Sequence, residues 1–97
     1  MTSYRLTFLR DAKKEWDKLG PDIRRRFGKK LTERLSNPRV ASARLSDMPD
    51  CYKIKLRSAG YRLVYRVHDD RIVVQVIAVG RRDRNLVYKI AAGRLDN

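Results

Sequence analysis

Around the middle of the chain, basic side chains alternate with apolar ones, which predicts a β-hairpin with one charged face. Successive residues of a strand point to opposite faces of a sheet, so Lys53 and Lys55 are predicted to share a face. If the hairpin pairs Leu56 with Tyr61, Lys55 lies directly opposite Arg62. Like charges in such positions destabilise a sheet. We therefore interpret the basic face as a surface that binds a polyanion.

These side chains suit phosphate chemistry better than ordinary acid–base chemistry. The planar fork of an arginine matches two phosphate oxygens, and a lysine can act as a base if neighbouring cations lower its pKa from about 10.4. The single histidine, His68, falls at a predicted turn, and no carboxylate is expected near the hairpin. From the alternation alone, an ordinary solvated sheet face explains the basic residues better than a functional site.

Composition indicates the same kind of partner. The chain has 24 Lys and Arg against 11 Asp and Glu, a net charge of +13 on 97 residues, which attracts nucleic acid or an anionic membrane. This length predicts one small domain, residues 1–97. Cys51 is the only cysteine, so no disulfide framework or zinc knuckle is expected. Without a long apolar run or a secretory signal, we expect a soluble, cytoplasmic protein that does not enter a membrane.

Periodicity predicts an α+β fold in which two N-terminal helices pack on one face of a largely antiparallel four-stranded sheet. A short C-terminal helix follows the sheet, and the basic face is expected to stay open. Residues 72–79 are almost continuously apolar, so they should form a strand buried on both faces. The predicted elements, in order, are a strand at 4–8, helices at 9–19 and 21–36, strands at 51–57, 61–68 and 72–79, and a helix at 86–92 that ends at Gly93.

Three stretches carry a resemblance to a known family. They are KKEWDKLG at 13–20, MPDCYKIKLRSAGYRLVY at 48–65 and VGRRDRNLVY at 79–88. The sequence resembles the RelE toxins of bacterial toxin–antitoxin systems, within the RelE/ParE superfamily, over nearly its whole length. The resemblance implies a toxin that enters the ribosomal A site, cuts the mRNA codon there, and is held silent by a cognate antitoxin.

The resemblance also implies functional residues. It places the catalytic set at Lys53, Lys55, Arg62, Arg82 and Tyr88. We further expect RNA contacts from Arg44, Arg57, Arg81 and Arg84, and contacts with ribosomal RNA from Arg24, Arg25, Lys29 and Lys30. RelE-type sequences can carry an arginine near the position of Ser46, whereas the nearest arginine here is Arg44.

With this set, RNA would be cut by its own 2′-hydroxyl attacking the adjacent phosphate, without a metal or another cofactor. That reaction needs a base, stabilisation of charge on phosphorus, and an acid for the leaving oxygen. Lys53 or Lys55 would be the base, and Arg62 would clamp the phosphate. Arg82 would stabilise developing charge and protonate the leaving group, although its own pKa exceeds about 12. Tyr88 would stack on a base or orient the 2′-hydroxyl.

The expected partners are a ribosome with mRNA in its A site and an acidic RelB-like antitoxin encoded next to the toxin. We also expect the toxin–antitoxin complex to bind its own operator DNA. Two alternatives remain at this point. One is a ParE-like toxin that inhibits DNA gyrase by binding it, and the other is a non-catalytic basic module that binds nucleic acid.

Overall fold

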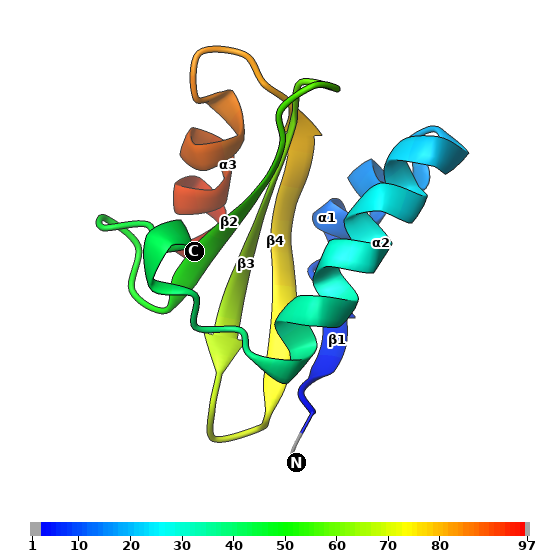
Figure 1. Cartoon of the computed structure of the whole chain (residues 1–97). Coiled ribbons are helices and arrows are strands. Elements are labelled where there is room, and N and C mark those ends of the chain that lie inside the picture. Colours follow the sequence, from blue (N-terminus) through cyan, green and yellow to red (C-terminus); the bar gives the residue numbers. More distant parts are fainter. Residues whose placement is uncertain (1–2, 97) are drawn as a thin grey trace.

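The computed structural model describes residues 3–96, which form a four-stranded sheet and three α-helices (Figure 1). The strands lie in the order β1-β4-β3-β2; β1 is parallel to β4, and the other pairs are antiparallel. The elements are β1 Arg5–Phe8, α1 Arg10–Asp17, α2 Pro21–Ser36, a 3₁₀ turn Ala41–Ala43, β2 Cys51–Leu56, β3 Tyr61–His68, β4 Val73–Arg81 and α3 Leu86–Leu95. The predicted α+β class and the two N-terminal helices are confirmed.

The main core lies between the sheet and the two N-terminal helices. In α2, Phe27 and Leu31 are buried, and Ile23 and Leu35 on the same stripe pack against the core, as their four-residue spacing predicts. Below them the sheet contributes alternate residues, among which Tyr65 is fully buried. This core supports one face of the hairpin, so the opposite face is the one available for a site.

A second, smaller core covers part of that opposite face. The register of β3 against β4 shifts between Val64 and Tyr65, which leaves Ile77 as an extra residue in β4. Helix α3 packs over this bulge with Val87 and Ala91 (Figure 1). We expected the basic face to stay fully open. This was wrong for the part beneath α3, because the apolar residues at the bulge form a surface on which this helix packs.

Several predicted boundaries also differ from the structure, and two of the differences have a clear local reason. Helix α3 continues through Gly93 to Leu95, because Leu95 packs against the second core and Gly93 does not take the left-handed conformation of a helix cap. Strand β4 begins at Val73 instead of Ile72, whose φ of 54° belongs to the preceding turn. None of the helices within residues 3–96 is both long and apolar enough to span a membrane.

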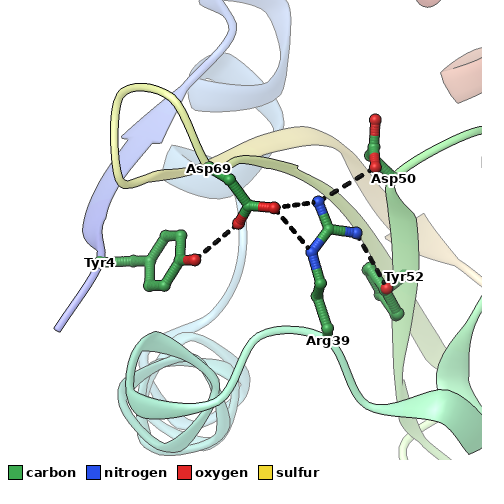
Figure 2. Close-up of polar contacts among 5 residues, drawn as sticks. All are labelled: Tyr4, Arg39, Asp50, Tyr52 and Asp69. Atoms are coloured by element: carbon green, nitrogen blue, oxygen red, sulfur yellow. Dashed lines mark hydrogen bonds and ion pairs between the residues drawn. The ribbon is translucent and has the colours of Figure 1, made fainter. Parts of the chain in front are cut away.

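Arg39 holds together the end of the sheet far from the β2–β3 turn (Figure 2). Its Nε and one terminal nitrogen lie 3.1 and 2.7 Å from the same oxygen of Asp69, while Tyr4 donates to the other Asp69 oxygen over 2.6 Å. Arg39 also contacts Asp50 at 3.1 Å and Tyr52 at 3.3 Å. The hydrogen bond from Tyr4, and then those from Arg39, lower the pKa of Asp69.

We expect Arg39→Met to lower the free energy of unfolding by about 1–2 kcal/mol at pH 7, the scale of a surface network of charged hydrogen bonds. The loss should shrink in acid. Because the folded-state pKa of Asp69 is lowered, its contribution is present above the unfolded value of about 3.9 and is lost as pH falls through the folded value. Urea unfolding between pH 7 and pH 2 measures both effects, with exposed Arg5→Met as the control. Equal stability losses for the two variants would contradict this role of Arg39.

Candidate active site

The β2–β3 hairpin adopts the register predicted from the sequence. Leu56 pairs with Tyr61, and Lys55 pairs with Arg62. Lys53 lies two residues before Lys55 on the same strand and hence on the same face. The like charges are thus stacked across the hairpin, as we expected.

These residues form one wall of a cleft of about 450 Å³. The other wall comes from the segment after β4 and from the first turn of α3, so the cleft lies between the sheet and this helix. All the residues in the predicted catalytic set line it, together with one of the predicted RNA contacts and four residues that we did not predict. The lining residues are Lys53, Lys55, Arg57, Arg62, Arg82, Asp83, Asn85, Leu86, Val87 and Tyr88.

Arg62 is the buried cation of the cleft, with only 8% of its surface exposed. One of its terminal nitrogens donates to the carbonyl oxygen of Tyr61 over 2.9 Å. Within residues 3–96 it forms no ion pair with a carboxylate. A buried charge without a counter-ion is unfavourable. Such a charge is expected at a binding site, where a bound anion supplies the counter-charge.

Lys55 is the lysine most affected by its neighbours. The charge of Lys53 lowers the pKa of Lys55 most, followed by partial desolvation and by the charges of Arg57, Arg62 and Arg82. A lowered pKa increases the neutral fraction of the amine at physiological pH, and only the neutral amine can accept a proton. The cation cluster therefore supplies a candidate base as well as an anion site.

The second wall of the cleft is held in place by backbone contacts. The Arg82 N–H donates to the carbonyl oxygen of Gly60 in the hairpin turn over 2.6 Å, which places Arg82 beside the turn. Arg84 and Asn85 then take left-handed φ values of 48° and 64°, an uncommon conformation for residues with a β-carbon. This strained turn leads directly into α3, where Tyr88 lines the cleft. The Tyr88 hydroxyl is buried and has no hydrogen-bond partner among the described residues.

Asp83 corrects our prediction that no carboxylate lies near the basic hairpin, because it also lines the cleft. Periodicity could not have found Asp83, Asn85 or Leu86, since they belong to an irregular turn and the first turn of a helix. The only signal in the sequence was a run of polar residues between a predicted strand and a predicted helix.

The other predicted contacts are divided between separate surfaces. Lys29 and Lys30 of α2 lie with Arg57 along a second groove beside the hairpin, which adjoins the cleft at Lys55. Arg24 and Arg25 do not line this groove; Arg25 instead pairs with Asp22 at 2.8 Å.

The remaining arginines lie outside the cleft lining. Arg81 stacks on the ring of Tyr61 at 5.5 Å, and Arg84 lines a separate, shallower pocket with Lys89. The backbone of Arg44 forms an isolated antiparallel β-bridge with that of Tyr52.

Comparison with known proteins gives consistent matches over almost the whole chain. Residues 6–86 match the family described as the ParE toxin of type II toxin–antitoxin system, parDE. The mRNA interferase toxin RelE of Escherichia coli (strain K12) is 54% identical over 93 residues, which are 96% of this chain and 98% of that protein. The chain is a member of the RelE/ParE toxin family.

Solved structures of RelE toxins share this fold. A mutant of E. coli RelE in the free state aligns with a TM-score of 0.88 and 52% identity, covering 96% of this chain and 98% of that one. A chain of the intact E. coli RelBE toxin–antitoxin complex aligns with a TM-score of 0.81 and 55% identity, covering 84% of this chain and 100% of that one. The identities to RelE proteins place the chain on the RelE side of the RelE/ParE family.

We expect Lys53→Gln to raise the pKa of Lys55, because it removes the charge that lowers this pKa most. Lysine-selective NMR titration of the side-chain carbon next to the amine measures the value directly. Lys14→Gln, an exposed substitution on α1, is the control and should leave the pKa of Lys55 unchanged. An unchanged Lys55 pKa in Lys53→Gln would mean that the two amines are too well separated by solvent to interact.

Proposed function

We propose that this protein is an mRNA interferase, the toxin of a type II toxin–antitoxin system, and that it cuts mRNA in the ribosomal A site. The observation that carries the proposal is the single cleft that gathers Lys53, Lys55, Arg62, Arg82 and Tyr88. The 54% identity to a protein named an mRNA interferase toxin supports the same activity. A cleft rich in cations and lined by an aromatic ring suits a phosphate with an unstacked base beside it.

In the proposed reaction, the 2′-oxygen of one nucleotide attacks the adjacent phosphorus. Lys55 takes the proton of the 2′-hydroxyl, because the surrounding cations lower its pKa. Arg62 holds the non-bridging phosphate oxygens, and the bound phosphate neutralises this buried cation. The bond from phosphorus to the 5′-oxygen breaks, leaving a 2′,3′-cyclic phosphate on one fragment and a 5′-hydroxyl on the other.

The remaining groups act on the leaving oxygen and on the nucleotide. Arg82 stabilises the charge that develops on the departing 5′-oxygen and gives it the proton that makes it a hydroxyl, while Lys53 keeps the pKa of Lys55 low. The ring of Tyr88 stacks on a base. Its buried hydroxyl, which makes no hydrogen bond within the described residues, is available to orient the 2′-hydroxyl. Arg57 continues the positive surface toward Lys29 and Lys30, where ribosomal RNA would lie.

A dependence on the ribosome follows from the weakness of this catalytic set. Arginine is a poor proton donor, and within the described residues the cleft has no histidine. If the ribosome holds the codon in line for attack, positioning alone can contribute up to about 7–11 kcal/mol. The protein would act in the cytoplasm, where ribosomes translate.

The proposed inhibitor is an acidic RelB-like antitoxin encoded beside the toxin. Solved structures contain E. coli RelE together with the RelB antitoxin, and the net charge of +13 favours an acidic partner. We expect the antitoxin to displace α3 and carry Tyr88 out of the cleft, and the complex to bind its own operator DNA.

A gyrase inhibitor of the ParE kind is the second candidate, because the matching family is described by that toxin. A toxin that inhibits gyrase by binding alone would not need the cations that cluster beside Tyr88. Supercoiling assays with gyrase distinguish the two candidates: inhibition of gyrase without cleavage of ribosome-bound message would replace the main proposal.

We expect purified protein to cut ribosome-bound mRNA and to leave naked RNA largely intact. Arg62→Ala and Arg82→Ala should each slow single-turnover cleavage at saturating protein by about 100-fold or more, the usual effect of removing a donor that stabilises a transition state. Exposed Arg71→Ala, at the other end of β3, is the matched control and should cut at the normal rate. Full-speed cleavage by both cleft variants would rule out the site, and equal rates on free and bound RNA would rule out ribosome dependence.

Hydrogen exchange tests the mode of inhibition. If the antitoxin displaces α3, amides around Tyr88 should exchange faster in the complex, even though binding normally adds protection. The buried strands β3 and β4 serve as an internal reference. Unchanged protection around Tyr88 would instead favour simple occlusion of Lys55 and Arg62.

A further inference from the structure

One ion pair joins the C-terminal turn of α3 to α1. Two terminal nitrogens of Arg94 each lie 2.9 Å from a different oxygen of Glu15, so the pair is bidentate. The side chains are only 20% and 29% exposed. The hydrogen bond with Glu15 raises the pKa of Arg94, in keeping with a charge that is held in place.

The pair also satisfies backbone groups of β4. Strand β1 pairs with β4 only as far as Val76, so the edge of β4 is uncovered beyond this point. There Arg94 donates to the carbonyl oxygen of Ile77 over 2.8 Å, and Glu15 accepts from the N–H of Val79 over 3.2 Å. Arg94 and Glu15 therefore bind the sheet edge as well as each other. These contacts hold the C-terminal end of α3 against both α1 and β4.

The other contacts of this helix are apolar. Val87 and Ala91 are its buried side chains, and both are small, while Tyr88, Ile90, Ala92 and Leu95 pack against the second core but stay partly exposed. Leu86 at its start is 46% exposed, and the turn before it is strained at Arg84 and Asn85. Most of these apolar side chains are small or partly exposed, which limits what each contributes to docking. A partly buried, bidentate charge pair therefore adds materially to the docking of this end of the helix.

We propose that Glu15 and Arg94 form a latch that docks α3 on the sheet and thereby positions Tyr88 in the cleft. Neither residue lines the cleft, so both are positioning residues. Tyr88 lies six residues before Arg94 in the same helix, roughly 9 Å along its axis, so a shift at one end moves the other. The link to cleavage rests on the function proposed above, whereas the link to α3 does not.

The test compares Arg94→Met, which keeps an unbranched apolar stem but removes the guanidinium, with Lys13→Met. The control removes an exposed ion pair to Asp17 on the same helix α1 that does not involve α3. Arg94→Met should increase amide exchange in residues 86–95 about tenfold, the scale expected for losing a hydrogen-bonded charge. It should also shift the fluorine NMR signal of Tyr88 in protein labelled with fluorotyrosine. Lys13→Met should do neither.

Two further variants guard against general unfolding. Glu15→Gln keeps an oxygen for the Val79 N–H but removes the charge, so it should reproduce the loosening of α3. Arg94→Lys keeps the charge without the fork and should fall between Arg94→Met and the wild type. If α3 protection and the Tyr88 signal are unchanged in Arg94→Met and Glu15→Gln, the latch is overturned.

Cleavage of ribosome-bound message supplies the last measurement. Arg94→Met should slow the chemical step about tenfold by misplacing Tyr88. In a Tyr88→Ala background the same change should cost less than about twofold, because the group it positions is gone. An equal loss in both backgrounds would overturn positioning through Tyr88. If the wild type does not cut at all, the proposed function fails, while the exchange and fluorine measurements still decide on the latch.

Discussion

Repulsion among the cations of the β2–β3 hairpin is the constraint on which the rest of the structure depends. Lys55 and Arg62 face each other directly, and Lys53 lies beside them. Such a pairing destabilises a sheet, so the stability of the hairpin must come from its opposite face. There Ile54 and Leu63 are almost fully buried in the main core. The molecule thus holds a charge cluster on one face of a sheet by packing the other.

The two walls of the cleft are packed very differently. The sheet wall is rigid, since its strands lie on the core formed by α1 and α2. The α3 wall rests on a small second core and begins at a strained turn. A cation cluster closed on all sides by a tightly packed wall would be hard to reach for a polymer such as RNA. A wall that is only lightly anchored leaves the cations accessible while still bringing Tyr88 close to them.

The part of the site that lies on regular elements could be predicted from the sequence. A period of two fixed the faces of Lys53 and Lys55, and the short turn at residues 58–60 fixed their register. The four-residue spacing of Phe27 and Leu31 likewise identified the buried side of α2. In these places local pattern and tertiary packing favour the same arrangement.

The rest depends on contacts between residues far apart in the chain, which periodicity does not contain. Helix α3 packs over the bulge at Ile77, yet the sequence there reads as an almost continuously apolar strand. Asp83 enters the cleft because Arg84 and Asn85 take left-handed conformations that nothing in their residue types requires.

The pairing of residues 15 and 94 illustrates the same limit most clearly. Glu15 is one of several charged residues in a predicted helix, and Arg94 follows a glycine that we took for the end of a helix. Only the gap left by the short strand β1 gives each of them a backbone partner on β4. Such a pair cannot form until α1, β4 and α3 are all in place, so no single element contains the signal for it. The α3 wall of the cleft is thus held by a contact that is specific in geometry and modest in energy, which is compatible with the displacement of α3 that we propose for the antitoxin complex.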